Sequence, residues 1–156
     1  MDTSYHLKRT TTADSDFQQL VFHLDHELWN ELKEDQATYD QHNKVPDIKT
    51  AVLVYQRDEA VACGCFKKVA ADTVEIKRMF VQKPYRGKGL SKQVLGELEK
   101  WALEEGFKQA VLETSIHFTT AKTLYQKSGY NIIPNYGPYV GLAESVCMKK
   151  QLAAQG

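Results

Sequence analysis

Apolar side chains recur along this chain with helical spacing in three stretches, and each stretch predicts a helix. The first is expected to pack on a sheet through positions i, i+3, i+4, i+7 and i+11, which are Phe17, Leu20, Val21, Leu24 and Leu28. The second is expected over 90–105, is terminated by Gly106 and buries Leu90, Val94, Leu95, Leu98, Trp101 and Ala102. The third is expected over 115–128, with Ala121, Leu124 and Tyr125 on its inner side.

Runs of β-branched and aromatic residues between turn residues predict strands. These strands are expected at 5–10, 49–56, 60–69, 73–81, 109–114 and 145–152. The strands at 73–81 and 109–114 are separated by a helix, so they are expected to be parallel. The strands before them read as an antiparallel meander, unlike a doubly wound nucleotide-binding fold. Segment 29–45 is expected to be a second helix or a partly helical loop, and 131–142 mostly loop.

The sequence also predicts the surroundings of one glycine, of three polar helix residues and of the three cysteines. Gly64 inside the strand at 60–69 suggests a bulge or close packing. The side chains of His23, His26 and Glu27 lie off the first helical stripe and are expected to be solvated. All three cysteines are expected to be reduced core residues, because their number is odd and they do not form a disulfide framework; they are Cys63, Cys65 and Cys147.

Composition narrows the class of protein. With 156 residues, 42% of them hydrophobic, we expect a single domain over 1–156. The 20 basic residues balance 20 acidic ones, which argues against a general nucleic-acid binder. The chain shows no apolar run of membrane-spanning length and no signal-peptide core at its start, so a cytoplasmic protein without a membrane partner is expected. The cysteines and histidines show no paired ligand spacing, so no metal is expected.

The segment 75–91, EIKRMFVQKPYRGKGLS, combines a strand, a short basic loop and the start of a helix. Pro84 ends the strand because proline has no N–H for a ladder. Glycines in the loop let backbone N–H groups converge near a helix N-terminus, an arrangement that binds anions. Formal positive charge surrounds the same point, on Lys83, Arg86, Lys88 and Lys92. A pyrophosphate would fit there, although the loop matches neither GxxxxGK[ST] nor GxGxxG.

Two motifs resemble a known superfamily. Arg86, Gly89 and Ser91 form the pattern Arg-x-x-Gly-x-small between a strand and a helix. This resembles motif A of the GNAT superfamily of N-acetyltransferases, whose pyrophosphate loop cradles acetyl-CoA, although Gly or Ala is usual where this chain has Ser91. The stretch 121–130, AKTLYQKSGY, together with LET at 112–114, is similar to motif B. Phe118 departs from it, since many relatives have Asn there and use it to contact the pantetheine arm.

The resemblance implies a fold and a cofactor. The fold is α/β (α+β), a GNAT-type mixed, mostly antiparallel central sheet of six to seven strands. About four helices flank this sheet, and a splayed parallel pair of strands lies at the cofactor site. The cofactor is acetyl-CoA, with coenzyme A as product and no metal. The implied cofactor-binding residues are Met79, Phe80, Val81, Arg86, Gly87, Lys88, Gly89, Leu90 and Ser91.

The resemblance also implies catalytic roles. Tyr125 is the candidate general acid, since a phenol is protonated at neutral pH and has a proton for a leaving thiolate; the alternative is a packed helix tyrosine. Glu75 is the candidate base, and the alternative is a charge pair with Lys77 or Arg78. Glu113 and His117 are lesser candidates for the base. Residues proposed for acceptor contact are Tyr39, His42, Asn43, His117, Tyr136 and Tyr139.

The sequence thus predicts an N-acetyltransferase that moves an acetyl group from acetyl-CoA to a small primary amine by direct transfer in a ternary complex. The main alternative is a catalytically silent acyl-CoA-binding sensor or regulatory module, which would keep the loop at 86–91 without needing Tyr125. A nucleic-acid binder built on the RGKG loop ranks third. The resemblance also implies that the protein can form a homodimer.

Overall fold

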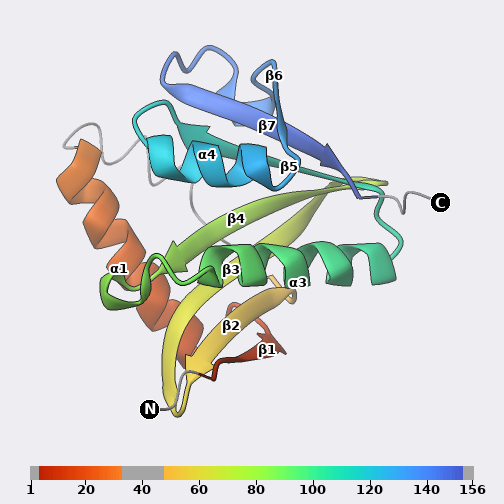
Figure 1. Ribbon diagram of the computed structural model, residues 1–156. Coiled ribbons are helices and arrows are strands. Elements are labelled where there is room, and N and C mark those ends of the chain that lie inside the picture. The colour runs from red at the N-terminus through yellow and green to blue at the C-terminus, as the bar shows by residue number, and fades with distance from the viewer. Residues whose placement is uncertain (1–3, 33–47, 153–156) are drawn as a thin grey trace. The chain divides into compact units, whose positions relative to one another are not determined.

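The computed structural model describes residues 4–32 and 48–152, and Figure 1 shows its ribbon. Seven strands form one sheet with the hydrogen-bonded order β1-β2-β3-β4-β5-β7-β6. The strands are β1 (His6–Thr10), β2 (Ala51–Gln56), β3 (Glu59–Ala70), β4 (Thr73–Val81), β5 (Gln109–Ser115), β6 (Asn131–Ile133) and β7 (Ser145–Gln151). The helices are α1 (Ser15–Leu32), α3 (Leu90–Glu104) and α4 (Thr119–Lys127), with short 3-10 helices at η1 (Lys83–Tyr85) and η2 (Gly137–Tyr139).

The chain divides into two compact units. Unit 1 comprises Met1–Lys67 and Lys77–Leu98, and unit 2 comprises Lys68–Ile76 and Glu99–Gly156. Both β4 and α3 therefore begin in one unit and end in the other. The prediction of a single domain over the whole chain stays a prediction.

In unit 1 an antiparallel meander supports α1. β1 pairs with β2 (Lys8↔Leu53), and β2 pairs with β3 (Leu53↔Cys63). The apolar stripe of α1 lies on one face of these strands, as the helical spacing predicts. The buried residues of this core are Phe17, Leu20, Ile48, Ala51, Leu53, Tyr55, Cys63, Cys65 and Phe80.

Gly64 faces the opposite side of β3, because side chains alternate along a strand. A Cβ placed on it would lie 2.6 Å from the sulfur of Met79 and 2.8 Å from Cγ1 of Val94 on α3. This close approach of a helix to β3 confirms the close packing that the sequence suggests. The three cysteines are free and buried, which agrees with the expected reduced core residues.

Unit 2 contains the parallel pair and the C-terminal strands. β4 pairs parallel with β5 through Thr73–Glu75 and Gln109–Val111, which confirms the predicted orientation. β5 pairs antiparallel with β7 (Glu113↔Cys147), and β7 pairs antiparallel with β6 (Ile133↔Cys147). Glu75 and Glu113 thus lie on two neighbouring strands.

Two boundaries differ from the prediction. The stretch 131–142, expected to be mostly loop, contains β6 and η2, because its β-branched residues pair with β7. The third helix begins at Thr119 rather than at 115. Ser115 instead pairs with Ser145 on β7, and a turn closed by the N–H of Phe118 and the carbonyl of Ser115 precedes the helix.

The expected second helix at 29–45 falls largely outside the described residues. Trp29–Leu32 continue α1. The described residues therefore hold three α-helices where about four were expected, while the mixed, mostly antiparallel sheet of seven strands is confirmed.

Candidate active site

A buried carboxyl group on β4 lies in a cluster of phenols in unit 2. Glu75 is 3% exposed. The hydroxyl of Tyr136 donates a hydrogen bond of 2.6 Å to its Oε2, and Tyr139 also donates a side-chain hydrogen bond to Glu75. The two rings meet edge to face with their centroids 5.5 Å apart. The predicted base thus meets two of the predicted acceptor-site residues.

The loop that carries both tyrosines is held by the side chain of Asn135 and by backbone hydrogen bonds. Asn135 donates from Nδ2 to the carbonyls of Tyr139 and Leu142, at 3.1 Å each. The N–H of Tyr139 donates to the carbonyl of Tyr136 within the turn. Both carbonyls also accept backbone bonds, from the N–H groups of Leu142 and Ser145 at 3.0 Å each, so the Asn135 amide reinforces the turn that positions the two hydroxyls.

Burial and the neighbouring carboxyl group keep both phenols protonated. Burial raises the pKa of Tyr136 well above the usual range for tyrosine, and the charge and hydrogen bond of Glu75 raise it further. The pKa of Tyr139 is raised for the same reasons, with Glu113 adding a second negative charge. Both hydroxyls therefore act as hydrogen-bond donors to Glu75 at neutral pH.

Tyr125, the predicted acid, is a buried tyrosine of α4. Burial raises its pKa well above the usual range, and the charge of Glu113 adds to the effect. Its ring lies edge to face against Tyr130, with centroids 6.0 Å apart. Its hydroxyl makes no hydrogen bond within the part of the chain that the structure describes. Tyr125 thus has a protonated hydroxyl with no protein partner there.

The lesser base candidates have their own partners. Glu113 accepts a hydrogen bond of 2.7 Å from the hydroxyl of Ser145. His117 lies in the turn after β5, where its Nε2 is 3.1 Å from a carboxylate oxygen of Glu144 and both side chains are 54% exposed. Tyr39, His42 and Asn43, also proposed for acceptor contact, lie outside the described residues.

In unit 1, the loop between β4 and α3 presents a run of backbone donors. Gly87 and Gly89 both have a φ of 79°, in the left-handed region that favours glycine. Among the described residues, no backbone N–H from Gly87 to Lys92 donates to a protein acceptor; the next, that of Gln93, donates to the carbonyl of Gly89 at 3.1 Å. Successive unpaired N–H groups at a helix start form a concave site for an anion.

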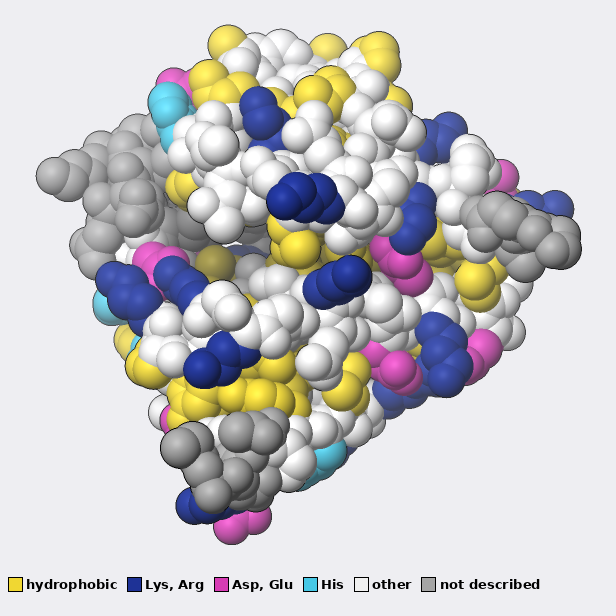
Figure 2. Space-filling view, in the orientation of Figure 1, with side chains coloured by type: hydrophobic (Ala, Val, Ile, Leu, Met, Phe, Trp, Pro, Cys, Tyr) yellow, Lys and Arg dark blue, Asp and Glu magenta, His cyan; other side chains and the backbone are white. Residues whose placement is uncertain are grey.

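Positive charge gathers around the same loop. Figure 2 shows dark-blue Lys and Arg side chains over the segment that joins β4 to α3. Lys83, Arg86, Lys88 and Lys92 are all exposed. Leu90 is 1% exposed and anchors the first turn of α3, while Ser91 beside it is half-buried. Anion binding by this loop stays a prediction.

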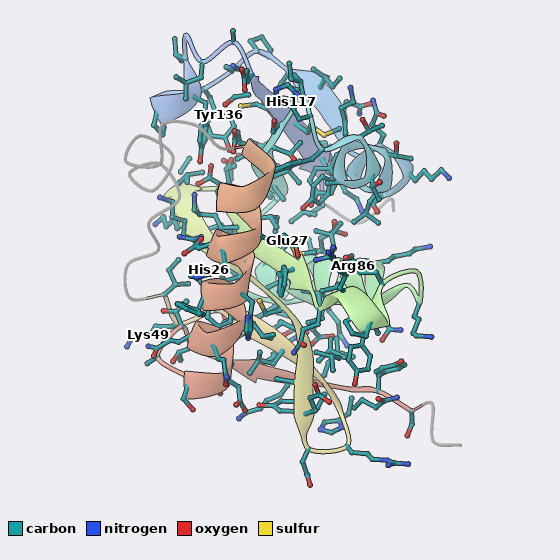
Figure 3. The ribbon with its side chains drawn as sticks, turned by 90° about the vertical axis from the view of Figure 1, so that its left-hand side faces the viewer. His26, Glu27, Lys49, Arg86, His117 and Tyr136 are labelled. Carbon is teal, nitrogen blue, oxygen red and sulfur yellow. The ribbon has the colours of Figure 1, made fainter. Side chains whose placement is uncertain are left out.

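Arg86 is anchored by protein groups. Its Nε donates to the carbonyl of Val81 at 2.8 Å, and its Nη2 donates to both carboxylate oxygens of Glu27 on α1, at 2.8 and 3.0 Å. The guanidinium lies 5.5 Å from the centroid of the Phe80 ring. Figure 3 shows Arg86 and Glu27 pointing toward one another. Nη1 is left without a partner among the described residues.

Glu27 is partly exposed, as expected, but it also forms an ion pair with Arg86 that the sequence does not predict. The signal was absent from the sequence, because a polar residue off the apolar stripe of a helix reads as a surface residue wherever the helix packs. Only the placement of α1 beside the loop brings Glu27 to Arg86, which is 59 residues away in the chain.

Unit 1 also holds a surface cavity of about 820 Å³. It is lined by Asp16, Gln19, Leu20, His23, Gln56, Arg57, Asp58, Glu59, Ala60, Gln82 and Tyr85. None of these lining residues is among those that the sequence predicts for catalysis or for binding. The predicted chemistry therefore lies elsewhere in the described chain.

The described residues show no sign of a membrane-spanning helix or of a metal site. No helix there is long and apolar enough to cross a bilayer. No group of three or more His, Cys, Asp and Glu side chains there is placed to hold a metal ion.

Comparison with known proteins gives consistent matches. The model of the acetyltransferase (GNAT) family matches residues 14–130. An IAA acetyltransferase of Azospirillum brasilense is 36% identical over 112 residues, which are 69% of this chain and 70% of the relative. A crystal structure of a candidate acyl-CoA N-acyltransferase from Klebsiella pneumoniae has a TM-score of 0.79 and 27% identity, covering 97% of this chain and 99% of that one.

A more distant structure shares the fold alone. The PaiA N-acetyltransferase of Thermoplasma acidophilum, solved in complex with coenzyme A, has a TM-score of 0.68 at 15% identity. The alignment covers 96% of this chain and 99% of that one.

Proposed function

The chain belongs to the acetyltransferase (GNAT) family, and on that premise we propose that it transfers an acetyl group from acetyl-CoA to a primary amine of a small molecule. The transfer is direct, within a ternary complex. The main support for this proposal is the buried Glu75, which accepts hydrogen bonds from the phenols of Tyr136 and Tyr139. This carboxyl group is only 3% exposed and is oriented by two hydrogen-bond donors, so it is positioned to act as a general base.

The cofactor would be held by the loop between β4 and α3. The unpaired N–H groups from Gly87 to Lys92 fit a pyrophosphate, and Arg86 and Lys88 add charge. A structural relative that was solved with coenzyme A supports this assignment. By the family resemblance, the backbone of Met79–Val81 lies along the pantetheine arm. When bound, acetyl-CoA supplies an acetyl thioester, the electrophile in the reaction.

Glu75 would act on the acceptor amine. An amine with the basicity of a lysine side chain is protonated at neutral pH and must lose a proton before it attacks. Glu75 accepts this proton, either directly or through water. Tyr136 and Tyr139 hold its oxygens in place during the transfer, because their raised pKa values keep them as donors.

Tyr125 would act at the departing sulfur. Its hydroxyl remains protonated because burial and Glu113 raise its pKa. It makes no hydrogen bond to another described residue that would have to break before it donates. Tyr125 therefore holds the proton that the leaving group requires.

Direct transfer agrees with the state of the cysteines. A ping-pong route needs a thiolate or another nucleophile. Burial raises the pKa of Cys147, and the carboxylates of Glu113 and Glu75 oppose its ionisation further, although a backbone hydrogen bond from Tyr136 partly offsets this. Cys63 is fully buried and its pKa is also raised by burial. Neither thiol is activated as a nucleophile.

The test has two steps. Calorimetric titration with acetyl-CoA is expected to give one-to-one binding that weakens at higher salt, because phosphates meet a basic loop. Release of coenzyme A is then followed over a panel of small amines. Tyr125→Phe is expected to lower the rate with the best amine by about tenfold or more. Tyr130→Phe is the matched control, since its hydroxyl already donates to Glu99 at 2.9 Å.

Binding without acetylation of any amine would favour the silent acyl-CoA-binding module. Acetylation that Tyr125→Phe leaves unchanged would remove the acid role from Tyr125. Absence of acetyl-CoA binding would refute both functions together.

A further inference from the structure

Arg78 on β4 combines three unfavourable features at one residue. Its φ is 58°, a left-handed value that is rare for a side chain with a Cβ. Its side chain is 7% exposed, so a guanidinium is taken out of water. Its Nε is fully buried and has no hydrogen-bond partner. Strained and unsatisfied groups of this kind collect at binding and catalytic sites, where a ligand compensates them.

The pattern of paired and unpaired nitrogens is specific. Nη1 donates to Oδ1 of Asp25 on α1 at 2.6 Å, and this is a single-point contact. Nε is unpaired, and Nη2 has no partner among the described residues either. In the planar guanidinium, Nε–H and the outer N–H of Nη2 point in parallel from one edge. That edge matches the two oxygens of a carboxylate.

The acidic groups nearest along these elements are already engaged. Glu27, two residues after Asp25 on α1, accepts hydrogen bonds from Arg86 through both of its carboxylate oxygens. Glu75, three residues before Arg78 on β4, accepts from Tyr136. The predicted alternative in which Arg78 pairs with Glu75 is thus replaced by a pair with Asp25.

We propose that the Nε–Nη2 edge of Arg78 binds a carboxylate of the acceptor, so that the acceptor is an amine that also carries a carboxylate, as an amino acid does. This inference rests on the proposed acetyl transfer. Arg78 directly precedes Met79–Val81, the part of β4 that is expected to lie along the cofactor. A carboxylate fixed at Arg78 would therefore orient the acceptor relative to the strand on which the reaction takes place.

Asp25 sets the strength of this site. It is 31% exposed, so the ion pair lies at the margin of the helix rather than deep in the core. Its negative charge opposes a second carboxylate at the same guanidinium. Removing that charge should strengthen the binding of a carboxylate, whereas shortening the arginine to a lysine should weaken it, because a lysine lacks the paired edge.

A direct binding test needs no turnover. The Nε–H resonance of Arg78 is assigned in a ¹H–¹⁵N spectrum by its loss in Arg78→Lys, and the wild type with coenzyme A is titrated with amino acids and with their carboxamides. We expect at least one amino acid to shift this resonance to saturation, and its carboxamide to leave it unmoved. No shift with any amino acid, or equal shifts with the carboxamides, would overturn the proposal.

A kinetic test uses the same matched pairs. In Arg78→Lys, kcat/KM for the amino acid is expected to fall by about tenfold or more, and that for its carboxamide to change by less than about twofold. Asp25→Asn is expected to lower KM for the amino acid. Arg9→Lys is the control for the loss of an ion-paired guanidinium elsewhere in unit 1, since Arg9 pairs with Glu97 at 2.7 Å and is more exposed than Arg78. Equal losses for both members of a pair would overturn the proposal.

Two further arms separate the possible failures. If no amine is acetylated, the proposed function fails, and the spectral titration alone decides whether Arg78 binds a carboxylate. If Arg78→Lys instead reduces transfer from succinyl-CoA to a carboxamide acceptor, the carboxylate at Arg78 belongs to the acyl group, and the acceptor assignment is wrong.

Discussion

The hydroxyl of Tyr136 lies 2.6 Å from Oε2 of Glu75, although 61 residues separate them in the chain. The hydrogen bond joins the loop between β6 and η2 to the first part of β4, where Glu75 is the third residue. It gives the buried carboxyl a fixed orientation, and the same loop brings a second phenol, that of Tyr139, to the same group.

Tyr136→Phe is expected to lower kcat for acetyl transfer by about tenfold, because a hydrogen bond to a charged group contributes about 1.5–3 kcal/mol. The affinity for acetyl-CoA is expected to stay unchanged. Steady-state kinetics and calorimetry of the same preparation measure both quantities. A loss of cofactor affinity at constant kcat would contradict a role through Glu75.

Glu27→Gln is expected to tighten acetyl-CoA binding by about two- to fivefold, because a partly exposed ion pair contributes up to about 1 kcal/mol and its carboxylate repels an incoming phosphate. Calorimetry at two salt concentrations measures the change, which should shrink at the higher one. Acetyl-pantetheine, which lacks the pyrophosphate, is the control ligand and should bind both proteins equally. Weaker binding by the variant would instead mean that Glu27 positions Arg86.

Gly64→Ala is expected to lower the free energy of unfolding by about 1–3 kcal/mol, because the new methyl group would overlap Met79 and Val94. Urea denaturation measures the change. Gly96→Ala on α3 is the matched control, since a Cβ there meets nothing within 4 Å. It should raise stability by about 0.5–1 kcal/mol through helix propensity. Two variants of equal stability would contradict the packing of α3 on β3.

Asp14→Asn is expected to remove a pH-dependent part of the stability. Burial alone would raise the pKa of Asp14, but hydrogen bonds from the Thr10 hydroxyl, the Asp16 N–H and Lys8 outweigh it, so the pKa lies below its usual value of 3.8. A depressed folded-state pKa contributes stability above the unfolded-state pKa, and this contribution is lost as the pH falls through the folded-state value.

Thermal unfolding from pH 7 to pH 2 measures this effect. At pH 7 the free energy of unfolding of the wild type should exceed that of Asp14→Asn by about 0.5–1 kcal/mol, which is typical of a helix-capping side chain with a partly screened charge. Below pH 3.8 the two free energies should converge. A difference that stays constant with pH would show that the carboxylate charge does not contribute.

Local sequence patterns are enough to predict the elements and the motifs. The bounds of β4 at 73–81 and of α3 from 90 follow from local periodicity, from Pro84 and from the glycines of the loop, which act within a few residues. The parallel orientation of β4 and β5 followed as well, because an intervening helix requires it. Glu75 and Tyr125 were identified through motifs that are read along the chain.

Which of these residues come into contact depends on how distant segments pack together. Tyr136 reaches Glu75 and Glu27 reaches Arg86 because strands and helices distant in sequence pack together. β6 forms because β7 offers it an edge, and Arg78 pairs with Asp25 because α1 brings that carboxylate to it. Such pairings depend on long-range packing and on the burial of charge, which local periodicity does not encode.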